Sequence, residues 1–138
     1  MALNQISVFL ENKSGRLAEL SEVLGRGGIN LRAVSIADTA DFGICRLIVS
    51  DTAKTLELLE KGGYTARQTE VVGIEVADEP GALAEILRLF NQTGVNIEYL
   101  YATLERKADK AVVIFKVDNP AEVSRIIKEQ GLTEVASL

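Results

Sequence analysis

The spacing of hydrophobic residues alternates along the chain between a period of two and a period near 3.6. Residues 6–10 alternate more and less apolar side chains, which predicts a β-strand with one buried face. Residues 17–24 place apolar side chains at helical spacing, with acidic residues on the other face. Gly27 and Gly28 follow and provide a helix stop. The first two predicted elements are therefore a strand and a helix.

Four more elements complete the first half of the chain. The polar stretch 38–41 separates two strand patterns and predicts a hairpin turn. Asp51 or Thr52 can cap the helix that follows, and Gly62 and Gly63 end it. In order, the four elements are strands at 31–37 and 43–50, a helix through 56–59 and an extended segment at 64–70.

The second half of the chain repeats the first. Gly15 and Gly81 are 66 positions apart, and the same offset aligns Gly28 with Gly94. The offset drifts by one or two residues at the second hairpin, where 105–109 form a longer turn, because insertions collect in loops. Each half has the order βαββαβ. This order predicts an α+β fold of two tandem ferredoxin-like units, each an antiparallel four-stranded sheet with both helices on one face.

The boundary between the units is expected near residue 70. Residues 71–74 form a short apolar connection without the Ser-rich or Pro-rich composition of a flexible linker. We therefore expect one domain at 1–70 and a second at 71–138. A unit of this size buries only ~60% of its unfolded surface and is marginal alone. Because such units also leave sheet surface and edge strands uncovered, we expect a homodimer or a larger symmetric assembly.

Composition argues against several classes of function. Fifteen basic against twenty acidic residues give a formal net charge of -5, which disfavours nucleic acid or an anionic membrane as a partner. The sequence has no histidine and one cysteine, Cys45, so metal-site and catalytic-triad chemistry are disfavoured and no cofactor is expected. No apolar run approaches the ~20 residues that a membrane helix needs. We expect a cytoplasmic protein without catalytic residues.

The candidate chemistry lies where a strand gives way to a helix. The second half has the elbow Asp78-Glu79-Pro80-Gly81-Ala82-Leu83, and the first half has Asn12-Lys13-Ser14-Gly15-Arg16-Leu17 at the same place. We expect Asp78 to accept hydrogen bonds from the first N–H groups of the helix. Pro80 is expected to fit the first turn, and Gly81 to leave the backbone open. A small anionic group could then bind there.

Local geometry is an alternative explanation for one elbow, because Asn, Ser, Pro and Gly all favour turns and caps. The repetition of the elbow in both halves argues for a function beyond local geometry. A glycine inside the first helical turn costs ~1 kcal/mol relative to alanine, and both copies keep one, which suggests that a ligand approaches the backbone closely. Two interpretations stay open for Asn30 and Asn96, which follow the helices: left-handed turn residues, or polar groups that face the elbow.

The elbows and the segments after the helices together resemble the ACT-domain pattern. That pattern is an acidic residue or Asn, any residue, Pro-Gly, any residue and Leu, followed later by Gly, an aliphatic residue, Asn and an aliphatic residue. Residues 78–83 and 94–97 match it. The first copy departs at Ser14, which replaces the proline, and it has Asn12 where the second copy has an acid. The resemblance covers the whole chain as two copies, similar to small stand-alone tandem ACT proteins.

The resemblance implies that a small molecule, usually an amino acid, binds between paired domains and contacts the elbow and the start of the second strand. The residues that match the pattern are Asn12, Ser14, Gly15, Asn30 and Leu31 in the first copy and Asp78, Pro80, Gly81, Asn96 and Ile97 in the second. Arg16, Glu79 and Ala82 complete the candidate ligand-binding set.

Charge makes the two candidate sites unequal. The α-carboxylate of an amino acid can take free N–H groups at a helix start, where the macrodipole carries roughly +0.5 charge. Asp78, Asn12 or a carbonyl of the strand can bind its ammonium group. Lys13 and Arg16 flank the first elbow, whereas Glu79 flanks the second. We expect the first site to tolerate an anionic ligand better.

The leading hypothesis is a non-catalytic regulatory module that binds an amino acid and so favours one arrangement of domains, with a regulated enzyme as its partner. The alternative is a structural protein–protein interaction module without a ligand. An acylphosphatase-like hydrolase is a distant third, because neither elbow has the glycine-rich loop ending in arginine that this chemistry uses. An RNA-recognition module is disfavoured because the strand at 43–50 lacks aromatic residues.

Overall fold

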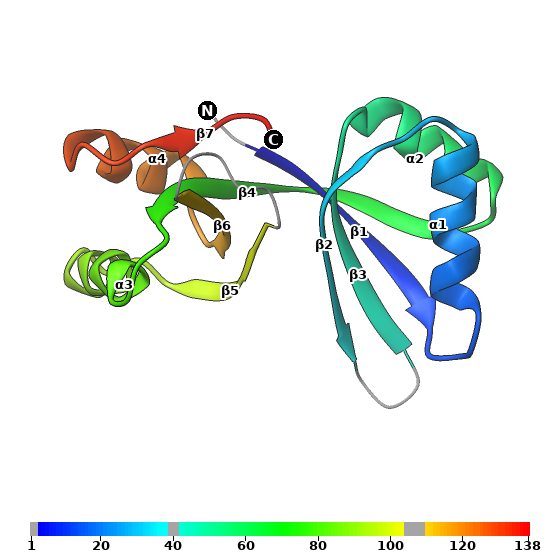
Figure 1. The fold of residues 1–138 in the computed structure, drawn as a ribbon, viewed down its shortest axis with the longest axis horizontal. Coiled ribbons are helices and arrows are strands. Elements are labelled where there is room, and N and C mark those ends of the chain that lie inside the picture. Colours follow the sequence, from blue (N-terminus) through cyan, green and yellow to red (C-terminus); the bar gives the residue numbers. More distant parts are fainter. Residues whose placement is uncertain (1–2, 39–41, 104–109) are drawn as a thin grey trace. The chain divides into compact units, whose positions relative to one another are not determined.

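Figure 1 shows the fold of the chain in a computed structural model that describes residues 3–38, 42–103 and 110–138. These residues divide into two compact units, Asn4–Thr69 and Glu70–Leu138, and Leu3 belongs to the second. Residues 39–41 of the hairpin turn predicted at 38–41, and the whole turn predicted at 105–109, lie outside the described residues, whereas Asp38 ends β2. The elements are β1 (Leu3–Glu11), α1 (Arg16–Arg26), β2 (Leu31–Asp38), β3 (Phe42–Val49), α2 (Thr52–Lys61), β4 (Thr65–Ala77), α3 (Ala82–Gln92), β5 (Ile97–Ala102), β6 (Lys110–Val117), α4 (Pro120–Glu129) and β7 (Glu134–Val135).

The first unit is a sheet in the order β2-β3-β1-β4, with α1 and α2 on one face (Figure 1). β3 pairs antiparallel with both β1 and β2. The alternation at 6–10 has the predicted effect, because its apolar side chains point under the helices. The buried core of this unit consists of Ile6, Val8, Leu10, Leu20, Leu24, Ile29, Cys45, Leu47 and Leu59.

The second unit has the equivalent order β7-β4-β6-β5, with α3 and α4 packed on its core. The rings of Phe90 and Phe115 meet edge to face at its centre, with centroids 5.3 Å apart and an interplanar angle of 82°. The extended segment expected after α4 contributes only the short β7, which pairs with β4 at two positions. The predicted fold class, two βαββαβ units with antiparallel sheets, is confirmed.

β4 differs from the expectation that residues 71–74 connect two strands. It is one uninterrupted strand of 13 residues, and Val71, Val72 and Ile74 are fully buried in it. A Cβ on Gly73 would lie 3.3 Å from Leu3 Cδ2, so the glycine makes room for the neighbouring strand. The same strand therefore ends the first unit and starts the second.

The N-cap residues of α2 and α4 show how the repeat continues after the second hairpin. The Asp51 side chain accepts a hydrogen bond from Lys54 N and caps α2, as predicted. Asn119 caps α4 in the same way, 68 positions later. The offset thus grows from 66 to 68 after the second hairpin, which confirms an insertion of two residues there. None of the helices in the described part of the chain is long and apolar enough to span a membrane.

Candidate functional site

Each elbow passes from strand to helix through a glycine in the left-handed region. Gly15 and Gly81 share a φ of 87° and a ψ of -11°, and each is the N-cap of its helix. Their carbonyls accept hydrogen bonds from Glu19 N at 3.0 Å and Glu85 N at 3.2 Å. In both elbows the N–H after the glycine donates at 3.3 Å to the carbonyl two residues before it. The two turns are therefore built alike.

The structure corrects three expectations about the elbows. The glycines precede the first helical turn instead of lying inside it, and their positive φ is by itself sufficient reason for glycine. No side chain caps either helix, because Asp78 and Asn12 lie three residues before the N-cap position from which a side chain can reach the helix. Pro80 lies before the N-cap and not in the first turn.

Two backbone N–H groups at each helix start have no hydrogen-bond partner among the residues that the structure describes. They belong to Leu17 and Ala18 in α1 and to Leu83 and Ala84 in α3. A Cβ added to either N-cap glycine would meet no atom within 4 Å, so the space beside each elbow is open. Paired donors at the positive end of a helix dipole form an arrangement that can bind a carboxylate or a phosphate.

The cations of the first elbow are already paired with carboxylates. Lys13 Nζ lies 3.0 Å from Glu11 Oε2, Arg16 Nη2 lies 3.4 Å from Glu11 Oε1, and Arg16 Nη1 lies 3.2 Å from Glu19 Oε2. The hydrogen bond from Lys13, followed by the charges of Lys13 and Arg16, holds the pKa of Glu11 below its usual value of 4.5. Residues 11–19 therefore carry two positive and two negative groups, which reduces the expected preference for an anion.

The second elbow has no cation of its own. At the offset of 66, Glu11 and Arg16 correspond to Ala77 and Ala82. Residues 77–85 carry three carboxylates and no lysine or arginine. This elbow attracts an ammonium group more strongly than the first and favours a carboxylate less.

Asn30 and Asn96 lie at the opposite end of the helix from the elbow of their own unit. Each follows an 11-residue helix, which is about 16 Å long at 1.5 Å per residue. Asn96 Nδ2 donates to Asp118 Oδ2 at 3.3 Å, beside a cavity of about 100 Å³. The Asn30 N–H donates to Ser50 Oγ at 3.0 Å. Neither asparagine therefore faces the elbow of its own unit.

The remaining candidate residues differ in exposure. Leu31 and Ile97 begin equivalent strands, but Leu31 is exposed whereas Ile97 packs against the core of the second unit. Arg16 and Ala82 are half-buried. The exposed members of the set are Asn12, Ser14, Gly15, Asn30, Asp78, Glu79, Pro80, Gly81 and Asn96.

Tyr64 is a polar side chain near the first elbow that the sequence pattern did not single out. Its hydroxyl is buried and has no hydrogen-bond partner among the described residues. Burial raises the pKa of Tyr64, Glu19 raises it further, and Arg16 lowers it. The phenol thus lies within electrostatic reach of the first turn of α1. Leu132 takes its place in the second copy, and this difference is the signal that could have identified it.

Metal chemistry finds no support in the described parts of the chain. Within 3–38, 42–103 and 110–138, no three histidine, cysteine or acidic side chains come together in a way that could hold a metal ion. Cys45 is fully buried in the first core, and burial raises the pKa of its thiol to about 11. A protonated, inaccessible thiol is unreactive at neutral pH and contributes to the packing of the core.

The sequence matches a family model described as an ACT domain pair over residues 1–137. The match spans nearly the whole chain, so the chain belongs to the ACT domain pair family. The resemblance noted in the elbow motifs is thereby confirmed. No curated protein matches the sequence.

Solved structures share the fold. A protein from Bacteroides thetaiotaomicron is 42% identical, with a TM-score of 0.93 over 99% of this chain and 94% of that one. The ligand-free regulatory subunit of aspartate kinase from Thermus thermophilus is 19% identical, with a TM-score of 0.66 over 91% of each chain. The Thermus flavus regulatory subunit is also 19% identical, with a TM-score of 0.65 over 89% of this chain and 86% of that one. At that identity, the kinase subunits show a common fold.

Proposed function

We propose that this ACT domain pair is a non-catalytic regulatory module that binds a small molecule, an amino acid, at its elbows. The observation that carries the proposal is the pair of unpartnered N–H groups that each glycine-capped helix presents to open space. The common fold with regulatory subunits of aspartate kinase supports a regulatory role. The ligand's carboxylate takes the two N–H groups, and its ammonium group takes the exposed side chain of Asp78 or Asn12.

A complete site needs more than one ACT domain. We place the domains at 1–70 and 71–138, each with an elbow at one end of a helix and an asparagine at the other. Because those ends are about 16 Å apart, a ligand that contacts both takes its asparagine from another ACT domain. Such a ligand stabilises one arrangement of domains over another, and this population shift is the regulatory signal to a partner enzyme.

A thermal-shift screen against the twenty amino acids tests the proposal, with calorimetry on each hit. A ligand at 100 times its Kd adds ~2.7 kcal/mol to the stability of the folded state. The elbows are then tested with Gly15→Asn and Gly81→Asn, because asparagine tolerates a positive φ while it adds a side chain beside the free N–H groups. Gly63→Asn is the matched control, since Gly63 also has a positive φ and open surroundings but lies after α2.

The expected result is that each elbow variant stays folded and loses one binding site, while the control keeps both. If no amino acid stabilises the protein, or if both elbow variants bind a hit with wild-type affinity and stoichiometry, the proposal is wrong.

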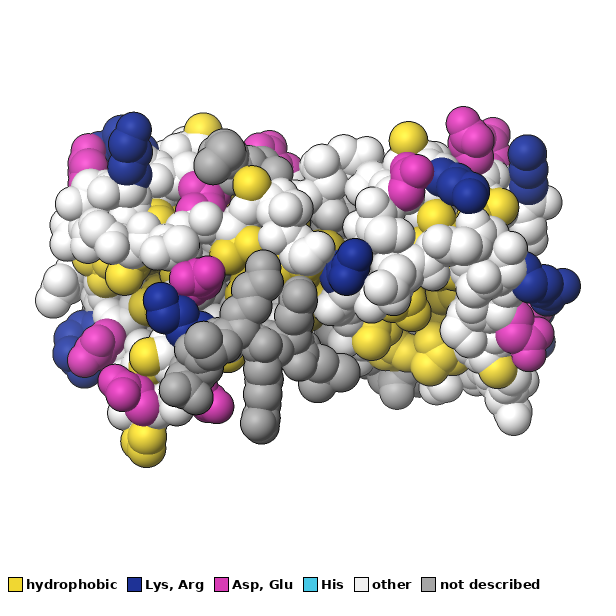
Figure 2. Space-filling view, turned by 45° about the horizontal axis from the view of Figure 1, so that its top comes forward, with side chains coloured by type: hydrophobic (Ala, Val, Ile, Leu, Met, Phe, Trp, Pro, Cys, Tyr) yellow, Lys and Arg dark blue, Asp and Glu magenta, His cyan; other side chains and the backbone are white. Residues whose placement is uncertain are grey.

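A protein-interaction module is the second candidate, and exposed apolar residues of the first unit favour it. Figure 2 shows hydrophobic side chains gathered on one face of this unit. Val34 and Ile36 on the edge strand β2 are 45% and 43% exposed, although they pair with the core residues Leu47 and Cys45. A second copy of the chain that covers this strand would form the homodimer that we propose for the protein in the cytoplasm.

A further inference from the structure

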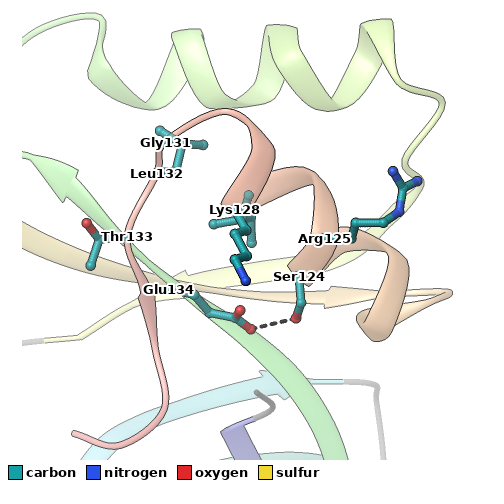
Figure 3. A pocket seen from close by; sticks show the side chains of 8 residues that line it. Ser124, Arg125, Lys128, Gly131, Leu132, Thr133 and Glu134 are labelled. Carbon is teal, nitrogen blue, oxygen red and sulfur yellow. Dashed lines mark hydrogen bonds between the residues drawn. The ribbon is translucent and has the colours of Figure 1, made fainter.

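A larger cavity lies in the second unit, apart from the elbow. It has a volume of about 660 Å³ and lies between α4 and the segment 131–134 (Figure 3). Ile127 and Leu132 give it an apolar lining, and none of the residues 78–85 is among the residues that line it. Its volume falls within the ~300–1,000 Å³ of small-molecule sites in proteins.

Two opposite charges face this cavity. Ser124 Oγ donates to Glu134 Oε1 at 2.7 Å, and Figure 3 shows the side chain of Lys128 extending toward this pair. Lys128 makes no ion pair with any residue in the described parts of the chain. Arg125 also lines the cavity, but its guanidinium extends away from this pair and lies 2.8 Å from Glu129. The cavity thus offers one ammonium and one carboxylate above an apolar lining.

The first unit shows that the fold does not require this polar arrangement. At the offset of 68, the positions of Ser124 and Glu134 are taken by Leu56 and Ala66, which pack against the core. Tyr64, where the second unit has a leucine, packs there as well. Apolar residues therefore occupy, in the first unit, the positions that are polar in the second. The hydrogen-bonded pair and its neighbouring ammonium are specific to the second unit.

We propose that this cavity is a second small-molecule site, for a zwitterionic amino acid with an aliphatic side chain. The ammonium group of Lys128 binds the ligand's carboxylate, and the carboxylate of Glu134 binds its ammonium group. A carboxylate has about four acceptor positions, so the hydroxyl of Ser124 leaves room on Glu134 for further partners, the ligand among them. The aliphatic side chain lies against Leu132 and Ile127. This site is independent of the elbows. Neither binding nor its absence in the cavity therefore tests the proposal that the elbows bind an amino acid.

Titration of the ¹⁵N-labelled full chain with L-leucine, followed by amide NMR shifts, tests the proposal. Shifts at 124–134 with one common Kd are expected, and Gly15→Asn and Gly81→Asn should leave them unchanged. Lys128→Gln should weaken binding roughly tenfold through loss of the charge-assisted hydrogen bond. Arg125→Gln is the matched control and should bind like wild type. Two probes that each lack one charge, 4-methylpentanoate and 3-methylbutylamine, should also bind roughly tenfold more weakly.

A second variant removes the polar pair of the cavity without removing Lys128. Ser124→Leu combined with Glu134→Ala copies the apolar pair of the first unit, so the fold should survive while leucine binding is lost. An unperturbed spectrum outside 124–134 verifies the fold. The proposal fails if these amides do not shift up to the solubility limit of leucine. It also fails if Lys128→Gln or the folded double variant binds with wild-type affinity.

Discussion

Gly15 and Gly81 lie 66 positions apart and have the same backbone conformation, φ 87° and ψ -11°. A β-branched side chain at this φ is strained whatever space surrounds it. Gly81→Val should therefore reduce the free energy of unfolding by at least ~1–2 kcal/mol, as should Gly15→Val. Urea denaturation measures the change. Gly25→Ala inside α1, where φ is not positive and space is open, is the control and should add roughly 0.5–1 kcal/mol.

The two elbows should differ in affinity. The second keeps the acidic residue and the proline of the ACT pattern, at Asp78 and Pro80, whereas the first has Asn12 and Ser14. For an amino acid found in the screen, we expect Gly81→Asn to remove the tighter of two calorimetric sites and Gly15→Asn the weaker. The reverse order of affinities would show that paired charges at the first elbow matter more than the pattern.

Glu11 should make stability depend on acid pH. Its pKa in the folded protein lies below 4.5, so the unfolded chain takes up the proton first as the pH falls. The stabilisation is complete above pH 4.5 and is lost progressively below it. Glu11→Gln should therefore lose stability less steeply below pH 4.5 in urea titrations at a series of pH values. Lys13→Gln removes the main cause of the shift and should behave similarly, and equal slopes in all three proteins would contradict the assignment.

Cys45 should report on unfolding of the first unit. The thiol is fully buried and its pKa is about 11, so at pH 8 it is protonated and inaccessible. Iodoacetamide should modify the native protein only as fast as the unit opens, and the urea-unfolded protein at the rate of a free thiol. Mass spectrometry of timed samples measures both rates. Rapid labelling of the native protein would mean that β3 is less well packed than described.

The edge strand β2 should decide the oligomeric state. Val34→Glu places a charge on the exposed apolar strip without touching the buried core, so the folded protein should shift from dimer to monomer. Sedimentation velocity at tens of micromolar provides the measurement. Leu100→Glu, an exposed position in the second unit, is the control and should leave the mass unchanged. A monomeric wild type would end the homodimer proposal.

The sequence was sufficient for features that depend on local chemistry. The cap at Asp51, the helix stops and the inward-pointing Ile6, Val8 and Leu10 all follow from side chains near their own backbone. The conformation of Gly81 was not predictable in this way, because glycine suits both a helical turn and a left-handed cap.

Features that depend on distant contacts were also missed. The hydrogen bond between Asn96 and Asp118 joins segments 22 positions apart. The cavity beside α4 is lined by Leu132, at the position where Tyr64 packs against the core of the first unit. The sequence shows this substitution, but only the three-dimensional structure shows the cavity beside it. The elbow motif was therefore sufficient to identify the family, whereas the contacts around the elbow became known only from the structure.

The continuous strand β4 makes the junction between the two copies intolerant of changes in length. Side chains on a strand alternate between faces, so one residue inserted between Glu70 and Val72 would turn every later side chain of β4 to the opposite face. Val72, Ile74 and Val76 would leave the core of the second unit. A loop between two domains tolerates insertions, but here one strand, β4, belongs to both copies, and the position of each residue in it fixes the face to which its side chain points. Insertions in homologous chains should accordingly be absent from 70–76 and should collect at the hairpin that already gained two residues.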